Sequence, residues 1–287
     1  MKHVFRIWFL GVTTIFAILA LGAATYAWFT SNRAVSTSTA SARTGEETLE
    51  LQLSSRGGSS FQSGQTVGIT QVNGTQATYL MPVSTADLQN FVYCPATVSD
   101  KAVHFQKVEN EQYYYHGRVY LRAAGSGWAD GTQLNLYLDQ SDGLLGQASS
   151  GTLLNAGRLG LVFDGNTSSP VILRLDENES SSSQQVYNTV INGRNLGKNQ
   201  VLRYQGGSVQ AAADPSVPVT DYTVTFSSDR ITFPGKALYT MELNKIYTLD
   251  IYFYLEGCDP DCSDSVSFDN ANLHLAFYGA VSQKEGS

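Results

Sequence analysis

Residues 256–264, with the sequence EGCDPDCSD, hold the densest group of potentially reactive side chains in the chain. Two cysteines four positions apart in an exported protein can close a small disulfide loop, which predicts a bond between Cys258 and Cys262. Their neighbours Asp259, Asp261 and Asp264 can instead gather a hard cation such as Ca²⁺ through carboxylate oxygens.

The composition of this segment favours the disulfide over the metal. The glycine and distal glutamate that an EF-hand loop needs at fixed positions are absent. Aspartate and proline are also ordinary turn residues, so they need no ligand to explain them. Cys94 is then the unpaired cysteine and is expected to be buried, with a Cys94–Cys258 bond as the alternative. We expect no cofactor, with a Ca²⁺ ion bound by these aspartates as the alternative.

The remaining residues show no recognisable catalytic pattern. His104, His116 and His274 each lack a His, Cys or carboxylate two positions away, which is the strand spacing of a metal-ligand pair. The chain contains no Gly-x-Ser-x-Gly nucleophile elbow and no phosphate-binding glycine loop. We therefore expect surface histidines, no catalytic residues and a protein that is not an enzyme, with an extracellular hydrolase as the least favoured reading.

Charge and composition exclude further classes. The 287 residues carry 18 basic and 25 acidic side chains, a formal net charge of −7. The basic residues are scattered, so the electrostatic footprint of a nucleic-acid-binding protein is missing. Sixteen Tyr, 13 Phe and 26 Gly favour strands and turns over helical bundles.

The N-terminus has the features of an export signal. Lys2 and Arg6 precede an uncharged apolar run from Ile7 to Phe29. Signal peptidase can cleave between Ala27 and Trp28, because Thr25 and Ala27 are small residues at the −3 and −1 positions. The run is also long enough to remain as a membrane anchor. Both readings place the rest of the chain outside the cytoplasm.

Period-2 alternation dominates the chain after residue 46. Apolar residues alternate with polar ones in many segments, among them 49–53, 113–122, 134–138, 159–163, 171–175, 222–226, 245–256 and 273–277. Asp-Gly and Asn-Gly turns separate several of these segments. The pattern predicts an all-β fold, an antiparallel β-sandwich preceded by one N-terminal hydrophobic helix. One further short helix is predicted over Thr85–Val92, capped by Ser84.

Three regions follow from these patterns. Residues 1–29 are a signal peptide or membrane anchor, residues 30–45 a Ser/Thr-rich linker or an extended strand, and residues 46–287 the β-sandwich domain.

The order of segments at the N-terminus resembles a known family. Residues 24–30, ATYAWFT, end the hydrophobic segment; a stretch of small residues runs to Thr44-Gly45, and residues 49–53, LELQL, follow. This order is similar to that in the TasA/camelysin family of exported bacterial surface and biofilm-matrix proteins. Residues 252–262, YFYLEGCDPDC, also look like a recurrent ending of bacterial proteins with such N-termini. The cysteines depart from TasA itself, and residues 54–245 match no pattern.

The resemblance implies a structural role outside the cell. Proteins of this family have a jelly-roll-like sandwich and form fibres when each subunit donates its N-terminal strand to the next. Carried over here, the donor segment is Arg33–Arg43, whose alternating positions are Arg33, Val35, Thr37, Thr39, Ser41 and Arg43. The implied partners are copies of this chain or related matrix subunits. The alternative is a membrane-anchored module that binds a glycan or protein through outward-facing tyrosines, namely Tyr114, Tyr120, Tyr252 and Tyr254.

Overall fold

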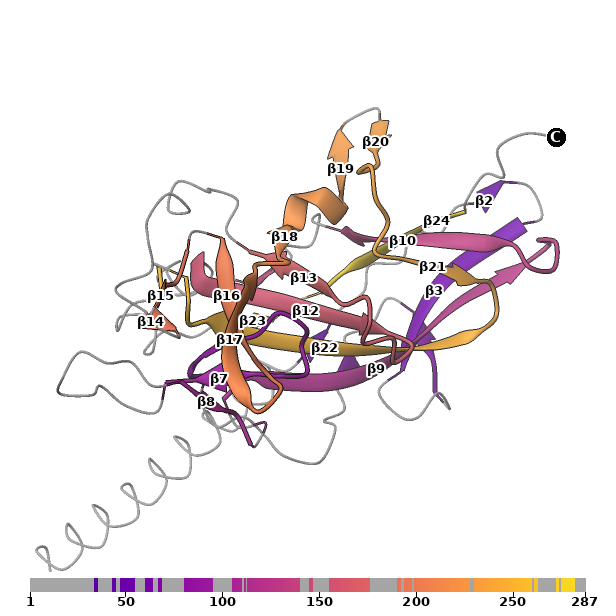
Figure 1. Cartoon of the computed structure of the whole chain (residues 1–287). Coiled ribbons are helices and arrows are strands. Elements are labelled where there is room, and N and C mark those ends of the chain that lie inside the picture. Colours follow the sequence, from indigo (N-terminus) through magenta and orange to yellow (C-terminus); the bar gives the residue numbers. More distant parts are fainter. Residues whose placement is uncertain are drawn as a thin grey trace, which may run out of the picture.

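The computed structural model describes residues 34–35, 43–44, 47–54, 60–63, 67–68, 80–94, 105–109, 111, 113–139, 145–146, 155–175, 190–191, 194–197, 199–227, 230–259, 261–262, 272–273 and 275–281. Almost all regular structure in these residues is β-strand, which confirms the all-β class (Figure 1). Within the same residues, no helix has the length and apolar character needed to cross a bilayer.

The larger of two main sheets forms the lower layer in Figure 1. Its longest strands are β9 (Tyr115–Ser126) and β22 (Ile246–Glu256), which pair antiparallel. Beyond β9 lies β3 (Glu47–Ser54), and beyond β22 lie in turn β12 (Gly157–Phe163), β13 (Val171–Arg174) and β18 (Val217–Pro218). Shorter strands extend the sheet: β2 (Arg43–Thr44), β4 (Gln62–Ser63), β6 (Pro82–Ser84), β7 (Val92–Tyr93) and β8 (Gln106–Lys107).

The smaller sheet is built around β10 (Gln133–Asp139). One side of β10 pairs antiparallel with β24 (Phe277–Val281). The other side pairs with β21 (Tyr239–Glu242) and, at its end, with β19 (Thr223–Ser227), which forms a hairpin with β20 (Arg230–Thr232).

Four separate two-stranded ladders and one 3₁₀ turn complete the described structure. The ladders are β1 (Ala34–Val35) with β5 (Val67–Gly68), β11 (Leu145–Gly146) with β23 (Asn272–Leu273), β14 (Val190–Ile191) with β15 (Arg194–Asn195), and β16 (Gln200–Gln205) with β17 (Ser208–Ala213). The turn η2 (Val219–Tyr222) leads into β19.

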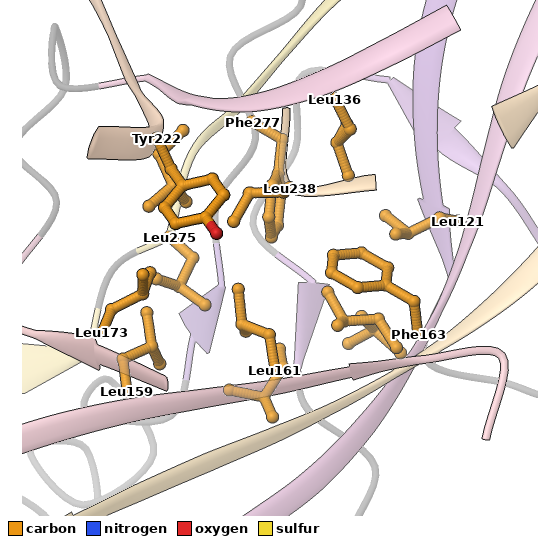
Figure 2. Close-up of a cluster of buried hydrophobic side chains, with 14 of the residues drawn as sticks. Leu121, Leu136, Leu159, Leu161, Phe163, Leu173, Tyr222, Leu238, Leu275 and Phe277 are labelled. Atoms are coloured by element: carbon orange, nitrogen blue, oxygen red, sulfur yellow. The ribbon is translucent and has the colours of Figure 1, made fainter. Parts of the chain in front are cut away.

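The main hydrophobic core lies between the two sheets. Figure 2 shows Leu159 and Leu161 of the large sheet facing Leu136 and Phe277 of the small one. All four side chains are 0% exposed. These positions are the apolar members of the period-2 pattern, so one face of each sheet is placed correctly by the sequence.

The opposite face of the large sheet is also covered, which the alternation does not predict. A second cluster of buried side chains lies there: Val83, Leu88, Phe91, Tyr114, Val162, Ile172 and Tyr254. Every residue of β12 is buried, because that strand is packed on both faces. The approach is so close that a Cβ at Gly160 would lie 2.6 Å from Leu88.

The predicted helix over Thr85–Val92 is wrong. Residues 86–90 form a series of bends, and Val92 is already in β7. Thr85 Oγ1 accepts hydrogen bonds from the backbone N–H groups of Asp87 and Leu88, at 3.2 and 3.1 Å. The Ser84 hydroxyl, predicted as the cap, instead accepts a hydrogen bond from the Leu202 N–H. Local side-chain acceptors thus replace helical hydrogen bonds.

Candidate functional site

The small sheet exposes apolar side chains on its outer face. Phe226, Ile231 and Phe233 are 41%, 38% and 43% exposed, and Tyr278 is half-buried among them. We call these four residues the aromatic patch. Tyr278 contacts the edge of Phe226 with ring centroids 5.8 Å apart, and it lies 5.9 Å from Phe233. Contiguous exposed apolar surface on a folded protein commonly marks an interaction site.

The hairpin of β19 and β20 positions half of this patch. Phe226 and Ile231 are directly opposite each other in its register. The hairpin joins the sheet only through Leu138↔Thr223 and Asp139↔Val224, and beyond these pairs it projects away from the body of the molecule (Figure 1). A projecting two-stranded hairpin is only marginally stable by itself. Packing of its exposed pair, Phe226 and Ile231, against another surface would therefore stabilise it.

Strand β24 forms an edge next to the patch. Five residue pairs join it to β10, and no other described strand pairs with it. The Ala276 carbonyl accepts a hydrogen bond from Asp139 N–H of β10. Because backbone groups along a strand point alternately to its two sides, the N–H and C=O groups of Phe277 and Gly279 point away from β10. An edge strand of this kind is a template for pairing with a further strand.

The covered face of the large sheet holds a polar network around His116. Its Nδ1 lies 3.2 Å from Glu111 Oε2, and its Nε2 lies 3.5 Å from Asp250 Oδ1. Arg118 donates two hydrogen bonds of 2.7 Å to the Asp250 carboxylate. Burial would raise the pKa of Asp250, but His116 and Arg118 outweigh it and hold the pKa below its usual value.

The expectation of a surface histidine is therefore wrong for His116. The residue is 9% exposed and its ring stacks on Tyr252 at 4.1 Å. Its carboxylate partners come from another strand and a preceding turn, so no spacing rule along one strand finds them. His104 and His274 are outside the described residues.

The segment that begins at Glu256 forms a second buried polar group. Glu256 is 2% exposed and accepts a hydrogen bond from the Cys258 N–H. Burial raises the pKa of Glu256 to about 8, against the opposing effect of nearby Arg158. Arg158 is 4% exposed and donates to Asp259 Oδ2 at 2.6 Å. A neutral Glu256 beside an Arg158–Asp259 ion pair leaves this buried group without net charge.

No disulfide bond joins Cys94, Cys258 or Cys262 in this structure. Cys258 packs with Val92, Leu196 and Leu202, whereas Cys262 packs against the main core. The predicted Cys258–Cys262 bond is thus not formed here, since the two side chains enter different clusters. Burial raises the pKa of both thiols, that of Cys262 to about 12.

The structure describes two aspartates of the predicted Ca²⁺ site, Asp259 and Asp261, so the site stays a prediction. Asp259 is engaged by Arg158, and its Oδ1 accepts the Asp261 N–H at 2.9 Å. Asp264 lies outside the described residues. No group of three or more potential metal ligands occurs within the part of the chain that the structure covers.

The N-terminal predictions fall mostly outside the described residues, including Ala27, Trp28, Arg33, Thr37, Thr39 and Ser41. Two ends of the candidate donor segment are described. Val35 lies in β1, opposite Val67 of β5, and Arg43 lies in β2, opposite Thr48 of β3.

The tyrosines predicted to face outward do not form a surface patch. Tyr114 and Tyr254 are 7% and 1% exposed, and Phe91 stacks on Tyr114 at 4.0 Å. The exposed aromatics are instead those of the small sheet. Sequence reasoning grouped Phe226 with the inward-facing Tyr222 and Val224, but only the latter two are buried. In the sequence, the polar residues Ser227, Ser228 and Asp229 that follow Phe226 are the signal that the apolar pattern ends there.

The chain was compared with known protein families, curated proteins and solved structures. No protein family, no curated protein and no solved structure was found to match the chain. The family of the chain is therefore not identified, and its function is inferred from the residues themselves.

Proposed function

We propose that this chain is an exported, non-enzymatic structural protein of the bacterial cell surface or extracellular matrix, which assembles with copies of itself by adding a strand to an open sheet edge. Its domain would be a jelly-roll-like β-sandwich, as in the TasA/camelysin proteins that its N-terminus resembles. The observation that carries the proposal is the side of β24 with which no described strand pairs, next to the aromatic patch. Backbone pairing at the edge would give affinity, and the apolar side chains would add buried area.

The described residues of the candidate donor segment pair within their own chain through short ladders. Two residue pairs join β1 to β5 and two join β2 to β3. Such short ladders cost little to exchange for equivalent pairs in a neighbour. The contact between donor and edge uses two different surfaces, so it does not close on itself and can propagate as a filament.

The buried polar groups fit a structural role. Asp250 pairs with Arg118, and Asp259 pairs with Arg158. Glu256 has a raised pKa, which favours its neutral, protonated form. Asp250, Arg158 and Glu256 are buried on strands of the large sheet. Charged groups that are paired and covered in this way hold a core together. They therefore support a protein that acts through shape and adhesion.

Deletion of residues 33–43 from the full-length chain tests the assembly. The expected result is loss of filaments in negative-stain electron microscopy of the secreted protein. A matched variant replaces the same residues by a Gly/Ser linker of equal length, which keeps the tether but removes the strand character. Loss in both variants supports strand donation, whereas filaments that persist in either variant refute it.

N-terminal sequencing tests the export step. A secreted chain that begins at Trp28 supports cleavage by signal peptidase and release for assembly. An intact Met1 in the membrane fraction supports the anchored alternative, in which residues 30–45 act as a stalk. A full-length chain in the soluble cytoplasmic fraction would contradict export altogether.

A further inference from the structure

A cavity opens at one end of the small sheet, away from both buried polar groups. It has a volume of about 270 Å³ and is formed by the loop after β12, the end of η2 and the segment leading into β21. Its walls include Phe163, Asn166, Ser169, Tyr222, Lys236 and Tyr239. The volume is near the lower limit for small-molecule sites, so the cavity has room for one small ring.

The walls of this cavity are held in place before any ligand binds. Tyr239 stacks on Phe163 at 4.7 Å with an angle of 5° between the rings, and Tyr222 is 4% exposed. The loop after β12 is fixed by a hydrogen bond from Asn166 N–H to the Phe163 carbonyl, and the facing segment is fixed to β10 by a hydrogen bond from Leu238 N–H to the Leu136 carbonyl. Preformed walls lower the entropic cost of binding.

Lys236 is the only charged residue among those that line the cavity. Its Nζ lies over the Tyr222 ring, 5.6 Å from the centroid. None of the ion pairs between described residues involves Lys236. Contact with an aromatic face holds the ammonium group weakly and leaves its N–H donors available to an anion.

The geometry points to a binding site for a hexuronic acid residue, the acidic sugar unit of anionic polysaccharides. A sugar ring has an apolar C–H face that suits the aromatic and aliphatic walls. Its hydroxyl groups match the polar side chains of Asn166 and Ser169 at the rim, and its carboxylate matches Lys236. Lys236 supplies the positive charge that would favour an acidic ligand over a neutral one.

Saturation-transfer NMR with the full-length chain tests this site, using glucuronate, glucose and acetate as separate probes. We expect binding of glucuronate in the millimolar range and at least tenfold weaker binding of glucose and acetate. Lys236→Gln is expected to weaken glucuronate binding at least tenfold without changing the melting temperature, because the side chain is exposed. Lys245→Gln is the matched control, since that exposed lysine pairs with Glu242 and should leave binding unchanged.

Three results would overturn the inference. If glucose binds as tightly as glucuronate, the carboxylate of the ligand does not contribute to binding. If acetate binds as tightly as glucuronate, the sugar ring does not contribute. Unchanged glucuronate binding by Lys236→Gln would place the ligand elsewhere. Because Lys236 lies outside β24 and the aromatic patch, none of these results depends on whether the chain forms filaments.

Discussion

The two sheets of this protein treat their outer faces in opposite ways. The large sheet covers its outer face with aromatic side chains and matched charges, so that Tyr254 and Glu256 are 1% and 2% exposed. The small sheet leaves Phe226 and Phe233 more than 40% exposed on its outer face. Both faces carry alternating patterns in the sequence, but among the described residues only the face of the large sheet is covered. The difference indicates that the large sheet provides stability and the small sheet provides contacts.

Removal of one aromatic ring from each face gives the largest expected contrast. Tyr254→Ala should lower the free energy of unfolding by about 4 kcal/mol, because it leaves a cavity in a packed cluster. Phe233→Ala should lower it by about 1 kcal/mol or less, because much of that ring is already in water. Urea denaturation measures both values, and equal losses would contradict the division between the faces.

A matched pair of arginines extends the comparison to charge. Arg158→Met should lower the free energy of unfolding by about 3 kcal/mol at neutral pH, since it leaves the Asp259 carboxylate without its partner. Arg230 is exposed on β20, so Arg230→Met should change stability by about 0.5 kcal/mol or less. If the two variants unfold at the same urea concentration, the buried ion pair does not contribute as proposed.

Glu256 should make the stability of the folded chain fall as the pH rises from 4.5 to 8. Its pKa is about 8 in the folded chain and 4.5 in the absence of the fold, so the folded state holds the proton more tightly. This contribution to stability is fully present below pH 4.5 and is lost as the pH rises toward 8.

Glu256→Gln should therefore flatten the fall in stability of the wild type between pH 4.5 and 8, as measured by urea denaturation at a series of pH values. Glu109 is exposed, so Glu109→Gln is the control and should keep the wild-type slope. An unchanged slope in Glu256→Gln would show that this carboxyl group is ionised in the folded chain.

Cysteine labelling measures the smallest of these expected differences, the burial and pairing of individual thiols. With reductant present, Cys258 should react last in the folded chain, because it is 3% exposed and burial raises its pKa. After unfolding without reductant, the structure predicts three labelled thiols, whereas a Cys258–Cys262 disulfide predicts one. Mass spectrometry distinguishes the two counts.

The sequence predicts the strands and the inner faces well, because alternation reports which side chains share a face. It does not report whether the other face is covered. The sequence pattern places Tyr254 on the outward face of its strand and Phe226 on the inward face, yet Tyr254 is buried against residues 83–91 and Phe226 is exposed. Asp250 beside His116 and Arg158 beside Glu256 are also invisible to local patterns, since each lies more than 90 positions from its partner in the sequence. Such contacts depend on tertiary structure.

Sedimentation velocity of the secreted chain tests most directly whether the small sheet is the assembly surface. We compare the wild type with a Phe226→Ser/Phe233→Ser double variant, and with Ala280→Lys, which places a charge on the edge strand β24. The account predicts large assemblies for the wild type and monomers for both variants, with little change in their unfolding free energy. A wild type that remains monomeric at high concentration, or variants that assemble as the wild type does, would contradict it.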